Sequence, residues 1–219
     1  MALTVADINA YVQFMMNDAG GSVYTAAVIL PAIKIANDDL QSKLLNANIE
    51  YLDEEASEQD IAIGGTALTT VPTDMVEPIE LHERPTTSTL LSDYVKMEYK
   101  NPLPDRTQTE TLQDWTWREH AVAFIGATVA RGVRLRYKKL ITALANDAST
   151  VAMQHSKNYF AYRAAGHLKA FIEENPEGAG IAYNSADDAL NDIIDLALKF
   201  QQKEPMRRKP FSRKFRRLR

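Results

Sequence analysis

The 219-residue sequence contains no cysteine, which excludes disulfide bonds and metal sites built from thiolates. This absence fits a protein of a reducing compartment. The sequence also has no run of about 20 apolar residues, the length that a helix needs to cross a bilayer, so we expect no membrane partner. The segment from Met1 to Asp7 lacks a basic region and carries an early aspartate, and we therefore expect no signal peptide.

Motifs that bind phosphate or activate a nucleophile are missing as well. Gly64-Gly65 is not followed by the lysine and helix of a phosphate-binding loop. Gly178-Ala179-Gly180 lacks the preceding strand and the third glycine of a dinucleotide-binding motif. Both segments predict turns. No serine lies in the sequence pattern of a nucleophile elbow. We predict that the protein is not an enzyme and binds no cofactor.

The four histidines do not have the spacing of a metal site. His155 and His167 could share a helix, but twelve residues would separate them by about 120° around it and about 18 Å along its axis. His82 and His120 are isolated in the sequence, and we interpret them as structural. The sequence therefore predicts no bound metal.

The net charge of −4 hides an uneven distribution. From Lys203 onward there are nine Lys/Arg and one Glu, which give +8, whereas the preceding residues hold 16 Lys/Arg and 28 Asp/Glu, which give −12. An acidic body with a basic arm suggests an arm that binds nucleic acid or a carboxylate-rich protein surface. A solvated, disordered tail has the same composition, and charge alone does not choose between the two.

The segment before this arm predicts an amphipathic helix that begins after Ser185, a plausible N-cap, and ends at Pro205. Its apolar stripe consists of Ala186, Leu190, Ile193, Ala197 and Phe200. Asp188, Asp192 and Asp195 share another face. We interpret them as a solvated acidic face, and an interface for a basic partner is the alternative.

The arm itself mixes cations with apolar residues, which a purely electrostatic tail does not need. Phe211, Phe215 and Leu218 lie among its Lys and Arg residues. This mixture favours docking into a protein groove, with phenylalanines as anchors and arginines as donors, although stacking on single-stranded bases uses the same residue types. The candidate docking residues are Arg207, Arg208, Lys209, Phe211, Arg213, Lys214, Phe215, Arg216, Arg217 and Arg219.

Three more helices are expected from apolar periodicity. The first runs from Thr4, its cap, to Asn17. The second covers residues 22–46, where Pro31 either kinks the helix or begins a new one. The third is capped by Asp147 or Ser149 and reaches residue 174.

Residues between the second and third helices have the pattern of short strands. The expected strands are 49–52, 61–63, 67–71, 79–84, 94–99, two within 114–125, and 133–138, with an acidic loop at 53–60. In the last strand Val133, Leu135 and Tyr137 alternate with basic residues, which predicts one apolar and one basic face.

These elements predict an α+β fold. Residues 1–48 and 143–204 form a bundle of about four antiparallel-packed helices, residues 49–142 form a β-rich insertion subdomain, and residues 205–219 form an extended basic C-terminal arm. The insertion is too long for an ordinary loop of a compact domain.

The order of these segments resembles that of the head–tail adaptor (connector) proteins of tailed bacteriophages, in the larger versions with a β-rich insertion. The resemblance lies in an early helix ending Ile35-Ala36-Asn37-Asp38-Asp39-Leu40-Gln41 and in the last helix with its tail, Phe200-Gln201-Gln202 and Arg207-Arg208-Lys209-Pro210-Phe211. Within the insertion it lies in residues 71–81, 114–117, 124–127 and 134–137. Many members of that family are smaller and nearly all helical.

The resemblance implies a structural role in the neck of the virion, after assembly in the host cytoplasm. Such adaptors form a homo-oligomeric ring, usually a dodecamer, beneath the portal protein. The ring extends the channel for double-stranded DNA and gives a platform for tail, tail-tube or nozzle proteins. The C-terminal arm would dock on the portal. We assign the ring contacts to apolar helical residues, namely Ile29, Ile33, Leu40, Leu190, Ile193 and Phe200.

Two other functions are open at this stage. The arm could bind nucleic acid directly, in which case about eight phosphate contacts would make the affinity fall steeply with salt. Alternatively, an enzyme site could lie in the insertion around Trp115, Trp117, Arg134 and Arg136, although no catalytic pattern supports it.

Overall fold

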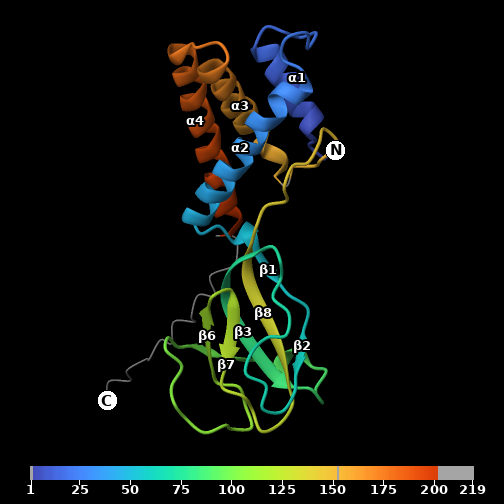
Figure 1. Cartoon of the computed structure of the whole chain (residues 1–219), viewed down its shortest axis with the longest axis vertical. Coiled ribbons are helices and arrows are strands. Elements are labelled where there is room, and N and C mark those ends of the chain that lie inside the picture. Colours follow the sequence, from blue (N-terminus) through green and yellow to red (C-terminus); the bar gives the residue numbers. More distant parts are fainter. Residues whose placement is uncertain (1, 152, 202–219) are drawn as a thin grey trace, which may run out of the picture.

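The computed structural model describes residues 2–151 and 153–201 and has an elongated shape with helices at one end and strands at the other (Figure 1). The fold is mixed α+β, as the sequence predicts. In the described part of the chain, four α-helices form the helical part: α1 Val5–Met15, α2 Ala26–Asn46, α3 Lys157–Phe171 and α4 Pro176–Gln201. Eight strands form the β part: β1 Asp53–Glu55, β2 Gln59–Ile61, β3 Met75–Pro85, β4 Val95–Lys96, β5 Glu98–Tyr99, β6 Asp114–Arg118, β7 Ala121–Phe124 and β8 Arg131–Lys139.

The first two helices begin and end close to where the sequence places them. Thr4 caps α1 in a capping box with Asp7, which confirms the predicted cap. Asn17, with φ of 57°, follows the helix in the left-handed region that turns the chain. Pro31 lies inside α2 and begins no new helix.

The last two helices begin elsewhere than expected. Asp147 and Ser149 do not cap α3, because the segment around them pairs with the start of α1 through hydrogen bonds from Val5 N to Ser149 O and from Ala6 N to Asp147 O. A 3-10 helix, η3 Gln154–Ser156, precedes α3 instead.

Helix α4 starts nine residues before the predicted cap, with Pro176 at its first position. Asn175 Oδ1 accepts a hydrogen bond from Gly178 N at 2.9 Å, as an N-cap does. Ser185 is therefore not a cap. It lies in the middle of the helix and its hydroxyl donates to Ile181 O.

Helix α3 is the centre of the helical part, since it packs against α1, α2 and α4. Gly166 allows the close approach to α4, because a Cβ atom there would lie 2.6 Å from the Tyr183 ring. The core of this part includes Ile8, Leu44 and Phe160, all with no exposed surface.

Two sheets make up the β part. The large sheet has the order β1-β8-β3-β4, and β2 also pairs with β8 beyond β1. The small sheet has the order β5-β6-β7, with β5 parallel to β6 and β7 antiparallel to it. A second hydrophobic cluster fills the space between the sheets and includes Leu81, Trp115 and Leu135.

Several strand predictions need correction. Residues 50–52 form a 3-10 helix, η1, because Ile49 and Leu52 lie three residues apart and both point into the helical core. The predicted acidic loop at 53–60 contains β1 and β2, and the acidic side chains of β1 pair with the cations of β8. Residues 61–63 and 67–71 do not form the predicted strand pair: β2 ends at Ile61, and Ala67 makes an isolated bridge to Ala123.

The strongest predicted strands are confirmed. Residues 114–139 form β6, β7 and β8, and Glu119 and His120 adopt positive φ at the turn between the first two. The alternation in β8 is also present, since Val133, Leu135 and Tyr137 are buried in the core between the sheets. Residues 94–99 divide between β4 of the large sheet and β5 of the small one.

Two chain segments join the helical part to the β part, at 47–52 and 139–145 (Figure 1). The buried Gln41 of α2 holds the second segment, because its side chain accepts from Ile141 N and donates to Lys139 O at 3.4 Å. Lys138 Nζ is buried and donates to Ile49 O at 3.0 Å in the first segment. Polar side chains thus fix the junction on both sides.

None of the helices within residues 2–151 and 153–201 is long and apolar enough to span a lipid bilayer.

Candidate functional site

The predicted docking residues of the C-terminal arm, Arg207 to Arg219, lie outside the described residues. The description ends at Gln201, the last residue of α4. That end of α4 lies where the helical part meets the β part (Figure 1). Any arm that continues from α4 therefore starts at the junction.

Five of the six predicted ring-contact residues occupy the core of the helical part. Ile29, Ile33, Leu40, Leu190 and Ile193 are at most 4% exposed and belong to one hydrophobic cluster. Phe200 lies at the end of α4. These five buried side chains contact the chain's own helices and are closed to any other molecule.

The outer face of the large sheet carries a network of ion pairs. Arg136 Nη2 lies 2.8 Å from Asp53 Oδ2, and its Nη1 lies 3.3 Å from Glu80 Oε1. Glu80 also accepts from Lys96 Nζ at 2.6 Å. The hydrogen bond from Lys96, together with that from Arg136, holds the pKa of Glu80 below its ordinary value. The basic face of β8 is thus neutralised by acids of β1 and β3.

An arginine pair encloses an aromatic ring beside this network. The guanidinium carbons of Arg84 and Arg134 lie 4.7 and 4.6 Å from the centre of the Tyr94 ring. Glu58 accepts from Arg84 Nε at 2.8 Å, and this contact lowers the pKa of the Glu58 carboxyl. Burial raises the pKa of Tyr94.

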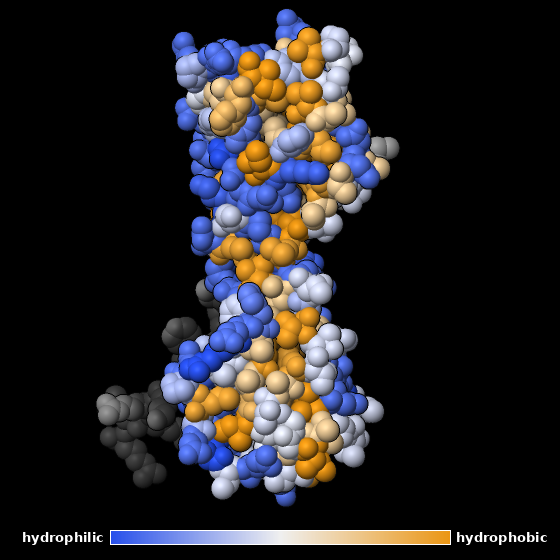
Figure 2. Space-filling view, in the orientation of Figure 1, coloured by the Kyte–Doolittle hydropathy of each residue, from blue (hydrophilic) through white to orange (hydrophobic). Residues whose placement is uncertain are grey.

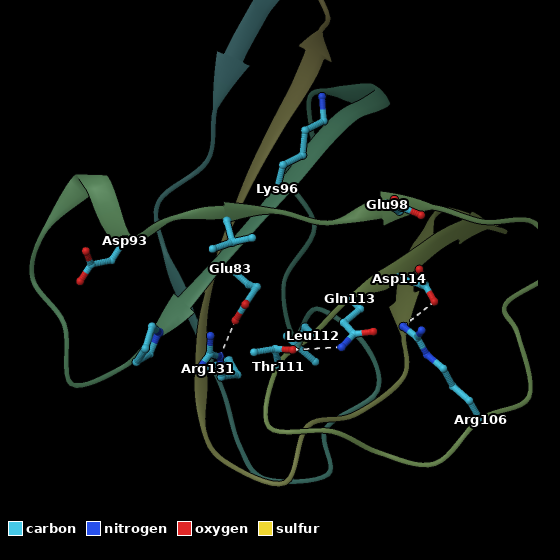
Figure 3. A pocket seen from close by; sticks show the side chains of 12 residues that line it. Glu83, Asp93, Lys96, Glu98, Arg106, Thr111, Leu112, Gln113, Asp114 and Arg131 are labelled. Atoms are coloured by element: carbon cyan, nitrogen blue, oxygen red, sulfur yellow. Dashed lines mark hydrogen bonds and ion pairs between the residues drawn. The ribbon is translucent and has the colours of Figure 1, made fainter.

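A cleft of about 700 Å³ lies between the two sheets (Figure 3). The Arg131–Glu83 ion pair forms one wall and is almost fully buried, since the side chains are 9% and 2% exposed. The Arg106–Asp114 pair forms the opposite wall at 2.5 Å. Thr111 lies between the two pairs (Figure 3).

The charges of this cleft satisfy one another. Besides the two ion pairs, Lys96 pairs with Glu80, Glu98 pairs with Lys100, and Asp93 accepts a hydrogen bond from Ser88. A buried pair of this kind fixes the relative position of two strands, because separating it leaves a charge without a partner in a low dielectric. The Arg131–Glu83 pair thus ties β8 to β3 within the large sheet, and the Arg106–Asp114 pair ties the segment before β6 to the small sheet, so the charges of the cleft have structural partners.

The four residues of the enzyme alternative are not brought together. Trp115 of β6 is 3% exposed and lies in the core between the sheets, where the Tyr99 ring contacts it edge-on at 4.9 Å. Arg134 and Arg136 alternate with the core residues of β8 and so lie on the other face of the large sheet. Trp117, in β6, is half-buried and lies 6.3 Å from the His120 ring.

The histidines are also apart. His155 is in η3 and His167 in α3, where it makes a hydrogen bond with the Tyr183 hydroxyl at 3.2 Å. Burial lowers the pKa of His167. Within residues 2–151 and 153–201, no three His, Asp or Glu side chains are placed to hold a metal ion.

The predicted acidic face of α4 is exposed. Asp188, Asp192 and Asp195 lie on the side of α4 that points away from α3. None of the three has a hydrogen bond or an ion pair to another described residue, in contrast to the paired acids of the β part. This face is hydrophilic along the edge of the molecule that α4 forms (Figure 2).

The end of the helical part farthest from the strands, here called the distal end, carries exposed apolar residues. Phe171 is 78% exposed, Ile172 52% and Ile181 65%. The α1–α2 and α3–α4 loops meet there, since Tyr24 Oη donates to Glu173 Oε1 at 2.8 Å. Burial, with the neighbouring Glu173, raises the pKa of Tyr24 to about 12.

Compared with known proteins, the chain matches no protein-family model and no curated protein. A proposal for its function therefore has to be argued from its geometry and its sequence pattern.

Two features of the site have no signal in the sequence. Glu83 and Arg131 are 48 residues apart, and only the pairing of β3 with β8 brings them into one wall of the cleft. Gln41 and Ile141 are 100 residues apart. The acidic face of α4, by contrast, follows from helical spacing and was found from sequence.

Proposed function

We propose that the protein is a structural head–tail adaptor of a tailed phage virion. In this role it forms a closed ring beneath the portal protein, extends the channel for double-stranded DNA and offers a platform for tail proteins. The C-terminal arm, residues 205–219, docks on the portal. The observation that carries the proposal is the order of the chain: two helices, a β part, two helices and a basic arm.

The division of the molecule into two parts supports this role. A bundle from residues 1–48 and 143–204 with residues 49–142 inserted gives a subunit whose ends can meet different partners. The two hydrophobic clusters give each part its own core, and the polar contacts of Gln41 and Lys138 fix the junction. An adaptor needs a two-ended shape because it connects one ring to another.

Exposed apolar residues on the first two helices support contacts between copies. Phe14 is 70% exposed, Ile35 48% and Val28 37%, whereas the core side chains of the helical part are buried and reach no other molecule. A subunit that presents one surface to a different surface of the next copy forms a ring when the rotation closes. In this arrangement these three side chains take the place of the buried residues that the sequence assigns to the ring contacts.

The charge distribution fits a DNA channel with a separate anchor. The residues before Lys203 carry −12, and like charge lets a duplex slide past instead of binding it. The segment from Lys203 onward has a net charge of +8, and its cations remain available for an acidic surface of a partner. A protein that bound nucleic acid through its arm would need the same cations. The charge distribution therefore fits both the adaptor role and nucleic-acid binding, and an experiment has to separate them.

The test is light scattering and negative-stain microscopy of the full chain, alone and with the portal protein of the same phage. We expect ring-sized assemblies with the portal and affinity for duplex DNA that is weak at physiological salt. A chain that stays monomeric with the portal present, and that binds DNA with a steep salt dependence lost on removing residues 205–219, would contradict the adaptor role.

A further inference from the structure

We propose that the C-terminal arm of each free chain docks on the outward face of its own α4, with its cations on Asp188, Asp192 and Asp195 and its apolar residues at the distal end. This contact holds the arm in a defined place before any partner takes it. The inference concerns the free protein and does not depend on the adaptor role.

The outward face of α4 lacks a partner within the described residues. Ala186, Leu190 and Ile193 of the opposite face are buried in the helical core. The outward face runs from Asp195 through Asp192 and Asp188 back to the exposed Ile181, with steps of three, four and seven residues that keep them on one line. The line thus begins with acids near the junction and ends with an apolar side chain.

The acids of this face are unfavourable for α4 by themselves. Asp188 and Asp192 are four residues apart, a spacing at which like charges repel. In the β part, acids such as Asp53 and Glu80 have cationic partners, whereas these three have none among the described residues. Nearby cations would relieve this repulsion.

The arm has the length to reach this whole face. From Gln201 back to Ile181 the helix covers about 30 Å, because each residue adds about 1.5 Å. Residues 202–219 span at most about 60 Å when extended, since each residue adds about 3.3 Å. Even Phe215, fourteen residues beyond Gln201, can reach the distal end, with an upper limit of about 46 Å.

The order of residue types along the arm matches the order along α4. The basic cluster Arg207-Arg208-Lys209 comes first, and beyond the exposed Lys199 a returning chain meets Asp195, Asp192 and Asp188 before the distal end. Phe211, Phe215 and Leu218 come later, and the apolar residues of the distal end come last.

The distal end offers both kinds of contact that the second half of the arm needs. Ile181, Ile172 and Phe171 are exposed apolar residues, and the exposed Glu174 and Glu177 lie among them in the chain. Phenylalanines bury best against such side chains, while Arg213 to Arg217 can pair with the glutamates. Figure 2 shows hydrophobic residues between hydrophilic ones at this end.

The test measures the distance between two spin labels in the full chain. Because the chain has no cysteine, Asn184→Cys on the outward face and Ser212→Cys in the arm place labels at chosen positions. The doubly labelled chain is diluted into a large excess of unlabelled chain and measured by double electron–electron resonance. We expect a short, narrow distance distribution that shifts to long, broad distances in the variant Asp188→Lys/Asp192→Lys/Asp195→Lys.

A matched control carries the same change of charge elsewhere. Asp60→Lys/Asp105→Lys/Glu110→Lys alters three exposed acids of the β part, and we expect it to leave the short distance unchanged. If circular dichroism shows that the α4 variant is unfolded, Asp188→Asn/Asp192→Asn/Asp195→Asn removes the charge at nearly constant shape and is expected to lose the short distance too.

Three results would overturn the inference. One is a long, broad distribution in the otherwise unaltered chain. Another is a short distance that persists in a folded α4 variant. The third is a short distance found only when chains labelled singly at 184 and at 212 are mixed, which would assign the contact to the arm of another copy.

Discussion

Single side chains hold this molecule together where secondary structure does not. Gln41 is the clearest case, since one buried amide supplies both a donor and an acceptor to the segment that enters the helical part from β8. Lys138 and Asp53 act similarly on the first junction segment, where a buried ammonium group bonds both the carboxylate and Ile49 O. The sequence contains no pattern for such contacts because their partners are about 90 to 100 residues away.

We predict that Gln41→Ala lowers the free energy of unfolding by about 1–3 kcal/mol, because Ile141 N loses its acceptor while buried. Urea denaturation followed by circular dichroism measures this change. Gln108→Ala, at an exposed glutamine, is the control and should change stability by less than about 0.5 kcal/mol. Equal effects of the two substitutions would show that Gln41 does not fix the junction.

Asp18 gives a pH-dependent prediction. Its carboxylate accepts hydrogen bonds from Tyr24 N and Val23 N, which lower its pKa from 3.8 to about 2. A lowered folded-state pKa means that the charged form stabilises the fold above pH 3.8 and that this contribution is lost as the pH falls towards about 2.

The difference in free energy of unfolding between the unaltered protein and the Asp18→Asn variant should therefore be constant near neutral pH and shrink below pH 3.8. Denaturation series at several pH values measure it, with Asp105→Asn as the control at an exposed acid. A difference that stays the same down to pH 2 would mean that the Asp18 charge does not hold the α1–α2 loop.

At the scale of elements, regular alternation of apolar and polar residues is the sequence pattern that predicted strands reliably. Strands β6, β7 and β8 were found from sequence because large apolar residues alternate with polar ones across a tight turn. The start of α4 was missed because its first turns pack with Ala179 and Ala182, whose small side chains make no visible stripe beside Gly178 and Gly180. Residues 49–52 form a 3-10 helix where a strand is expected, because so short a segment, with Ile49 and Leu52 at its ends, fits a strand and a 3-10 turn equally well.

The α3–α4 contact provides a prediction at this scale. Gly166→Ala should destabilise the protein by about 1–3 kcal/mol, although alanine favours helix, because the new methyl meets the Tyr183 ring. That ring has little freedom to move, since Arg163 lies 4.9 Å from its centre and His167 bonds its hydroxyl. Thermal unfolding gives the measurement.

Gly180→Ala is the matched control, because nothing lies within 4 Å of a Cβ atom there. We expect it to raise stability by about 0.4–1 kcal/mol through the lower entropy of the unfolded chain. A stabilising effect of both substitutions would contradict the close approach of the two helices at Gly166.

At the scale of the whole molecule, the class of fold was predictable and the site was not. Helical periodicity, then strands, then helices again indicated α+β, and the structure agrees. The cleft between the sheets was not predictable, since its walls depend on the pairing of β3 with β8, which brings Glu83 to Arg131, and on the contact of Arg106 with Asp114. The predicted ring contacts were placed on apolar stripes, and those stripes form the interior of the helical part.

The adaptor role is tested most directly by binding of the portal protein to the full chain and to a chain that ends at Glu204. Co-sedimentation with assembled portal rings is the measurement, and circular dichroism shows whether both chains are folded. We expect the full chain to sediment with the portal and the shortened chain to stay in solution with its helices and strands intact. Equal binding of both chains, or no binding of either, would contradict the central claim that the arm joins this protein to the portal.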